Sequence, residues 1–283
     1  MPDPITRAAL DADMPAVRAV ASHFDLLGKW PGTPDFLDAE RTFGDLLVGS
    51  DGHAGVVGYG GTLRRGSVTH LGDLFVLPEH QSSGIGRMLL DELLPHGAPL
   101  VTFASADPRA MALYVRRGMR PRCPLLYLTG SPRSLDRPVA YGEQAERAGA
   151  RPAGKAGKAG EAGKLDAEVS GGDRSATLAW YAGLPGVTCG VIGGGYAFAR
   201  LAGGELVVGP AGGVTPPDCV AAVLGACAAH PEVDVVRMAV PGAHPLLPAL
   251  LAAGWRITDM DTFMTSDDSL VRLDRYVPHP DLG

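Results

Sequence analysis

Two segments of the chain carry the same order of secondary-structure signals, and this repetition constrains the fold more than any other feature. Without gaps, residues 100–130 align with residues 236–266 at an offset of about 136. Each segment has an apolar strand, a helix stopped by glycine (Gly118 and Gly254) and a second strand. We therefore predict two copies of one α/β unit, although any strand-helix-strand unit can align in this way.

Apolar periodicity and turn residues give the expected elements of each copy. In the first copy we expect strands at 5–10, 45–48, 54–63, 68–77, 100–104 and 125–128, and helices at 14–24, 34–43, 85–94 and 108–117. In the second copy we expect strands at 190–201, 205–208, 235–240 and 261–265, and helices at 217–229 and 245–253. This alternation predicts an α/β (mixed α+β) sheet in each copy.

The segment between the copies has almost no apolar periodicity and contains the run RPAGKAGKAGEAGK. Such a segment buries too little apolar surface to offset the entropy of ordering it. We predict domains at 1–133 and 174–283 joined by a flexible linker at 134–173, with a transient helix as the alternative. A cut within 155–164 is then expected to leave both halves folded.

Bulk composition narrows the class of protein. The chain has 283 residues, 46% hydrophobic content and a net charge of −6, which argues against a nucleic-acid partner and is compatible with a cationic substrate. Its four cysteines are widely spaced, and its first residues lack the apolar core of a signal peptide. We expect a cytoplasmic protein with reduced thiols and no membrane partner, as a monomer or homodimer.

The loop QSSGIG, residues 81–86, follows the strand-like run LGDLFVL and opens an apolar helix. Glycines permit positive φ and let a ligand approach the backbone closely. Unpaired amides at a helix N-terminus favour an anion such as a pyrophosphate. Taken alone, the loop is equally compatible with a structural turn.

The sequence around this loop resembles a known family. The stretch LGDLFVLPEHQSSGIGRMLLDELL resembles motif A of the GNAT superfamily of N-acetyltransferases, with Gln81, Gly84 and Gly86 at its signature positions. The stretch ADPRAMALYVRRGMRPR resembles motif B, including Tyr114. The resemblance spans residues 4 to about 130. It implies a GNAT acyltransferase fold, here as two tandem GNAT-like domains of which the second is degenerate.

The resemblance also implies a binding site for acetyl-CoA as acyl donor, without a metal. Loop amides would hold the pyrophosphate, and the preceding strand would pair with the pantetheine arm where two strands separate. The loop has Ser82-Ser83 where many members have basic residues, and Asp107 replaces a more usual Asn. The implied cofactor-binding residues are Phe75, Val76, Gln81, Ser82, Ser83, Gly84, Ile85, Gly86, Arg87, Asp107 and Ala110.

Three residues are candidates for proton transfer. By resemblance, Tyr114 is the general acid that protonates the departing thiolate, since its hydroxyl has an unperturbed pKa near 10. Polyamine-acetylating members have a Glu base where this chain has Gly72, so that position is empty here. Asp73 and His70 are the remaining candidate bases, and simple strand alternation places them on opposite faces. A solvent-facing or turn-capping role is the alternative for both.

The loop between the first two helices lines the acceptor pocket in this family. Phe24 and Trp30 are expected to form apolar or cation–π walls there, and Asp25 to pair with an amine, unless the loop is an ordinary connection. The second half lacks the loop motif and has Pro216-Pro217 at the start of its matching helix. We expect no acetyl-CoA in that half, with a second ligand site as the alternative.

These features predict an enzyme that acetylates the amine of a small molecule by direct transfer in a ternary complex. Two alternatives remain open at this stage. One is a protein lysine or N-terminal acetyltransferase, and the other is a non-catalytic regulator that binds acyl-CoA.

Overall fold

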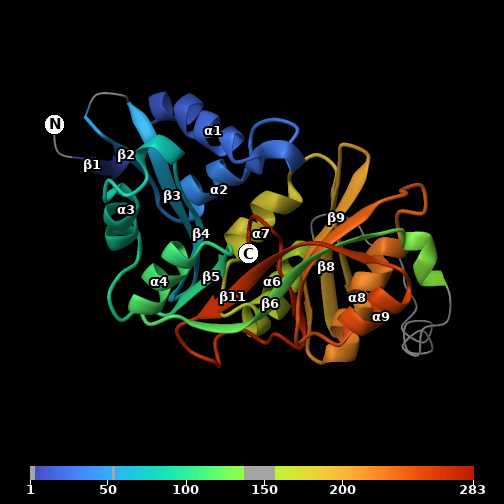
Figure 1. Cartoon of the computed structure of the whole chain (residues 1–283). Coiled ribbons are helices and arrows are strands. Elements are labelled where there is room, and N and C mark those ends of the chain that lie inside the picture. Colours follow the sequence, from blue (N-terminus) through green and yellow to red (C-terminus); the bar gives the residue numbers. More distant parts are fainter. Residues whose placement is uncertain (1–3, 53–54, 137–156) are drawn as a thin grey trace.

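The computed structural model describes residues 4–52, 55–136 and 157–283. Within these residues the strands form one continuous sheet that crosses both halves of the molecule, with helices on both faces (Figure 1). None of the helices described is long and apolar enough to cross a membrane.

The first half has the predicted order of elements, whereas the second half has helices α6 and α7 and strand β12 in addition to the predicted ones. The first half contains β1 (Ile5–Ala8), α1 (Met14–His23), α2 (Phe36–Phe43), β2 (Leu46–Ser50), β3 (Val56–Arg65), β4 (Val68–Val76), α3 (Ile85–Leu93), β5 (Leu100–Ala104), α4 (Pro108–Arg116) and β6 (Arg120–Gly130). The second half contains α6 (Gly157–Val169), α7 (Ser175–Ala182), β7 (Val187–Ile192), β8 (Gly195–Ala202), β9 (Glu205–Gly213), α8 (Pro216–Ala228), β10 (Val236–Pro241), α9 (Leu246–Ala252), β11 (Arg256–Thr265) and β12 (Tyr276–Val277). The single strand expected at 190–201 is in fact the hairpin β7–β8, because the glycines between them form a turn.

The two halves exchange strands in the centre of the sheet. The order is β1-β2-β3-β4-β5-β11-β6-β10-β9-β8-β7, so β11 of the second half lies between β5 and β6 of the first. Strand β11 runs antiparallel to both neighbours, and β6 in turn pairs with β10. Neither half therefore completes its own sheet. This arrangement argues against the expectation that the halves fold independently after a cut between them.

Helices from both halves cover each face of the sheet. Helices α1, α2, α6 and α7 share one buried apolar cluster that includes Val17, Leu37, Leu178 and Tyr181. On the other face, α3 and α4 pack over the first half, and α8 and α9 over the second. The shared cluster means that apolar burial, as well as strand pairing, joins the halves.

Part of the predicted linker, residues 134–173, belongs to the fold. Residues 137–156 lie outside the described residues, but residues 157–169 form helix α6, so the linker prediction is wrong for this part. Asp166 on α6 is fully buried and accepts two hydrogen bonds from the Arg174 guanidinium, at 2.8 and 2.9 Å. A buried ion pair of this kind holds α6 in one position, because separating it leaves two unpaired charges.

Candidate functional site

Strands β4 and β5 pair over three residues and then separate. The parallel partners are Thr69–Leu100, His70–Val101 and Leu71–Thr102, and no later pair joins these strands in the described structure. Residues 72–76, here called the open edge of β4, are therefore unpaired on the β5 side. They include the predicted Phe75 and Val76. An unpaired strand edge offers backbone donors and acceptors to an extended ligand.

A β-bulge at Gly72 decides which side chains share a face of β4. Asp73 pairs with Gly61, whereas Leu71 pairs with the very next residue of β3, so Gly72 is an extra residue in the strand. The bulge places His70 and Asp73 on the same face. The expectation that they point to opposite faces was wrong, because simple alternation does not allow for an extra residue.

The QSSGIG loop has the conformation of a ligand cradle. Ser82 and Gly84 have positive φ values of 66° and 93°, and Gly84 is the N-cap of α3. A Cβ built on Gly84 would meet no atom within 4 Å, so the space beside it is open. Ile85 is fully buried in the core, and its side chain is therefore not available to a ligand.

An open groove of about 870 Å³ joins this loop to α4. It brings together nine of the predicted cofactor-binding residues. The residues that line it are Leu74, Val76, His80, Gln81, Ser82, Ser83, Gly84, Gly86, Arg87, Asp107, Pro108, Arg109, Ala110, Ala112, Leu113 and Arg116.

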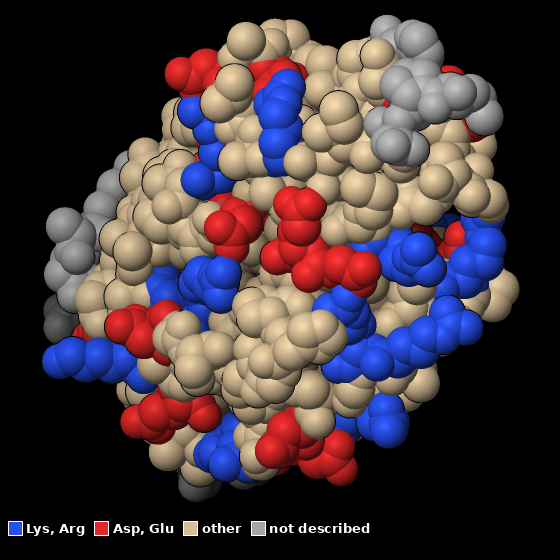
Figure 2. Space-filling view, turned by 90° about the vertical axis from the view of Figure 1, so that its left-hand side faces the viewer, with Lys and Arg blue, Asp and Glu red and all other residues tan. Residues whose placement is uncertain are grey.

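Arginines outside the loop supply positive charge to this groove. Arg109 donates to Asp107, at 2.7 Å, and to Gln81, at 3.1 Å, and so connects the two motifs. Arg87 and Arg116 also line the groove. Figure 2 views the end of the molecule formed by the first half, where blue Lys and Arg side chains gather along one side of the face. The sequence-based interpretation missed Arg109 and Arg116 because it looked for basic residues only inside the loop.

Tyr114 lies on α4 and is 7% exposed. Burial raises the pKa of its hydroxyl, and the charge of Asp73 raises it further. The hydroxyl therefore keeps its proton at neutral pH and can act as a donor. The electrostatic effect of Asp73 also indicates that these two predicted residues lie near one another.

Glu40 is a site residue that the sequence did not reveal. Its side chain is fully buried, and neither carboxyl oxygen has a hydrogen-bond partner among the described residues. A Cβ on Gly61 would lie 1.8 Å from this carboxyl group and one on Gly72 would lie 2.3 Å from it, so both glycines make room for it. The sequence signal that could have revealed Glu40 is its position one helical turn after Leu37, which places an acidic residue on the buried face of α2.

Glu40, Asp73 and Asp281 form a group that we call the acid cluster. Burial raises the pKa of Glu40 well above its usual value, and the charges of Asp73 and Asp281 add to this effect. Burial, with the charge of Asp281, also raises the pKa of Asp73 to about 8. The Tyr59 hydroxyl donates to Asp73 at 3.2 Å. A cation placed near carboxyl groups that raise one another's pKa favours their ionised forms.

His70 occupies a core position. It is 1% exposed and packs against Phe103 with ring centroids 4.8 Å apart. Burial lowers its pKa well below the usual value. A Cβ on Gly283 would approach its Nε2 to 2.7 Å, so the C-terminal segment covers the ring. His70 lines neither the groove nor the cavity described next.

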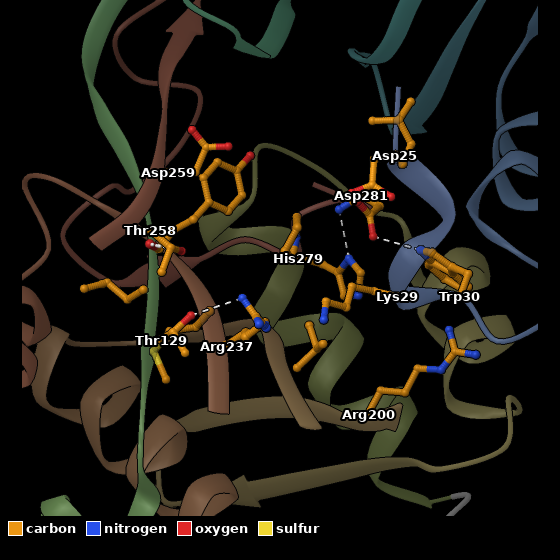
Figure 3. A pocket seen from close by; sticks show the side chains of 16 residues that line it. Asp25, Lys29, Trp30, Thr129, Arg200, Arg237, Thr258, Asp259, His279 and Asp281 are labelled. Carbon is orange, nitrogen blue, oxygen red and sulfur yellow. Dashed lines mark hydrogen bonds between the residues drawn. The ribbon is translucent and has the colours of Figure 1, made fainter. Parts of the chain in front are cut away.

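A second cavity, of about 300 Å³, lies between the halves (Figure 3). It includes Asp25 and Trp30, as expected, whereas Phe24 packs on Phe75 with ring centroids 5.0 Å apart. Its lining residues are Asp25, Leu26, Lys29, Trp30, Tyr127, Leu128, Thr129, Arg200, Val207, Arg237, Met238, Thr258, Asp259, His279, Pro280 and Asp281. Asp281 belongs both to this cavity and to the acid cluster.

In the second half, the strand edge that corresponds to the open edge of β4 is covered by another strand. Strand β9 pairs with β10 from Leu206 to Val208, again for three residues. Beyond this point β12 pairs with β9, through Tyr276–Gly212 and Val277–Ala211. The C-terminal segment therefore occupies the strand edge that remains open in β4.

Helix α8 also begins differently from α3. Thr215 and Asp218 cap it reciprocally, and Pro216 and Pro217 supply no N–H groups to its first turn. These features support the expectation that the second half holds no acetyl-CoA.

Comparisons with known proteins agree with this architecture. Residues 12–119 match the family model described as the acetyltransferase (GNAT) family, and this segment of the chain belongs to that family. The chain as a whole has a tandem GNAT fold. No curated protein matches the sequence significantly.

Solved structures resemble the entire chain at low sequence identity. A putative acetyltransferase from Pyrococcus horikoshii is 16% identical, with a TM-score of 0.73, and the match covers 100% of this chain and 97% of that one. A tandem GNAT protein from the clavulanic acid biosynthesis pathway is 18% identical, with a TM-score of 0.51 and coverage of 93% and 97%. A glucosamine N-acetyltransferase region of a fungal β-N-acetylglucosaminidase is 14% identical, with a TM-score of 0.64, and the match covers 94% of this chain and 38% of that one.

Proposed function

We propose that the protein transfers the acetyl group of acetyl-CoA to the amine of a small molecule. One observation carries the proposal: the open edge of β4 leads from Asp73 of the acid cluster, beside the bulge at Gly72, to the QSSGIG loop. The groove suits a long anionic donor, and the acid cluster suits a cationic amine. The small size of the cavity between the halves, about 300 Å³, favours a metabolite over a peptide as acceptor.

The proposed reaction follows from these positions. The acid cluster loses one proton when the ammonium group of the acceptor binds, because the cation lowers the raised pKa of Asp73. The Asp73 carboxylate then accepts one proton from that ammonium group, with Glu40 behind it. The free amine attacks the thioester carbonyl carbon, a C–N bond forms and the C–S bond breaks. Tyr114 donates its proton to the thiolate and recovers one from the amide nitrogen. One proton is released for each amide formed.

Loop amides from Ser83 to Arg87 would hold the pyrophosphate, and the backbone of Phe75 and Val76 would pair with the pantetheine arm. Most of the rate enhancement would come from holding the amine against the thioester. His70 has no role in this proposal, because its ring packs on Phe103 beneath the C-terminal segment and burial keeps its pKa well below the usual value.

A CoA-release assay over a panel of primary amines tests the proposal. We expect steady, enzyme-dependent release of CoA with at least one class of small amine, and mass spectrometry should find the acetylated product. If acetyl-CoA binds but no small amine is acetylated, the proposal fails and a regulator that binds acyl-CoA becomes the better interpretation. If only peptides are acetylated, the acceptor class is wrong.

A further inference from the structure

Trp30 organises one wall of the cavity between the halves. Its indole N–H donates to Asp281 Oδ2 at 2.8 Å, and the guanidinium carbon of Arg200 lies 4.3 Å from the ring centroid (Figure 3). An acidic and a basic side chain thus contact the edge and the face of the same indole. No hydrogen bond or ion pair connects Arg200 with Asp281 in the part of the chain that the structure describes.

Arg200 is a buried cation with unused hydrogen-bond donors. Its side chain lines the cavity, yet the residue is only 5% exposed. Its Nε and Nη1 have no hydrogen-bond partner among the described residues. A buried guanidinium with unused donors is costly unless an anion joins it, and stacking on Trp30 leaves its in-plane donors available.

The other basic side chains of the cavity are paired with an acid or neutral. Arg237 donates to both carboxyl oxygens of Glu205, at 2.6 and 3.0 Å, and Lys29 donates to the same carboxylate at 2.5 Å. Burial lowers the pKa of His279 to about 3, so its ring is neutral. Arg200 is therefore the cavity cation with donors to spare.

We propose that the acceptor is a zwitterion, an amine that also carries a carboxylate, and that Arg200 binds this carboxylate. The inference rests on the proposed function and specifies its substrate class. The ammonium group would lie toward Asp281 and the acid cluster, and the carboxylate would lie against Arg200. A guanidinium matches a carboxylate with two parallel N–H donors, which favours this anion. The acceptor site then belongs to both halves, since Trp30 comes from the first and Arg200 from the second.

The first test compares matched pairs of amines on the unmodified, full-length protein. Each pair consists of an amino acid and the amine left by removal of its carboxylate, such as ornithine and putrescine, or phenylalanine and phenethylamine. We expect kcat/KM to be at least about tenfold higher for the member with the carboxylate. One charge-assisted pair of hydrogen bonds gives an effect of this size.

The second test uses Arg200→Gln, which removes the charge and keeps a side chain of similar length. We expect kcat/KM for the amino acid to fall by about tenfold or more, mainly through KM, while kcat/KM for the decarboxylated partner changes by less than about threefold. Arg237→Gln is the matched control. Because Arg237 is already bound to Glu205, its loss should affect both members of a pair alike.

The outcomes separate this inference from the proposed function. Equal rates for both members of every pair, or a preference for the decarboxylated member, would overturn the zwitterion while leaving the acetyltransferase in place. A preference for phosphoethanolamine over all amino acids would replace the carboxylate by a phosphate. No turnover of any amine would remove both proposals. If Arg200→Gln does not fold, the comparison on the unmodified protein still decides.

Discussion

The two halves of the molecule have the same framework but treat one strand edge in opposite ways. In both, a long strand pairs with its parallel neighbour for three residues and then leaves it, β4 from β5 and β9 from β10. In the first half the edge beyond this point is open, and in the second β12 occupies it. The comparison teaches that the same framework can leave this strand edge open or fill it with its own chain, with the scaffold intact.

The largest effect is expected when the two halves are separated. Residues 1–136 produced alone should lack a cooperative thermal transition, because β11 is missing from between β5 and β6 and the apolar cluster shared with α6 and α7 is lost. Circular dichroism melting and amide hydrogen exchange would measure this. Co-expression with residues 157–283 should restore the transition. A cooperatively folded isolated first half would show that the exchanged strand is dispensable.

Tyr114→Phe should lower kcat by roughly 100-fold or more, the usual contribution of a positioned acid. Binding of acetyl-CoA, measured by calorimetry, should hardly change. The aligned residue of the second half is Leu250, which is also fully buried. Leu250→Met is the matched control and should leave kcat unchanged. Full activity in Tyr114→Phe would remove this hydroxyl from the mechanism.

The two helix starts can be compared by adding a negative charge to each. Ser83→Glu, in the QSSGIG loop, should weaken acetyl-CoA binding by about tenfold through repulsion of its phosphates, or ~1.4 kcal/mol. Val214→Glu, at an exposed residue just before α8, should leave the dissociation constant unchanged. Equal weakening by both substitutions would indicate that the donor also binds the second half.

The last expected effect is on stability. The pKa of Asp73 is raised from 3.8 to about 8. Between about pH 4 and pH 8 the native protein therefore keeps a proton on Asp73 that the unfolded chain has already released. Its contribution therefore lowers the free energy of unfolding as pH rises through this window, and levels off above it. Asp73→Asn removes this contribution. The difference in free energy of unfolding between the variant and the unmodified protein should therefore favour the variant more at pH 8 than at pH 5.

Urea denaturation at the two pH values measures the difference. Asp274→Asn, at an exposed carboxylate of the second half, is the control and should change stability equally at both. Parallel pH profiles for Asp73→Asn and the unmodified protein would contradict the raised pKa. The same variant should lose turnover, since Asp73 is the proposed first proton acceptor.

Local patterns allowed most elements of the fold to be predicted. The QSSGIG loop and the glycine that ends α4, Gly118, depend on residues close together in the sequence. The positions predicted for both were therefore correct. Helix α6 was missed because its stability comes from the Asp166–Arg174 ion pair and from tertiary packing, while its Ala- and Gly-rich sequence resembles a linker.

Parts of the candidate site depend on distant contacts and could not be read from the sequence. The bulge at Gly72 depends on the register with β3, and one extra residue turned Asp73 to the face of His70. Glu40 became visible only when α2 was placed over two glycines of neighbouring strands. Arg200 lies far along the chain from Trp30, and the two meet because the halves pack on one another around a shared apolar cluster.

The exchanged strand also sets the order of events during synthesis. A ribosome completes β5 and β6 long before residues 256–265 leave its exit tunnel, so the nascent first half has two strand edges without their native partner for much of translation. Unpaired edges of this kind are sites of aggregation. The groove beside the QSSGIG loop therefore acquires its final support only after nearly the whole chain has been made.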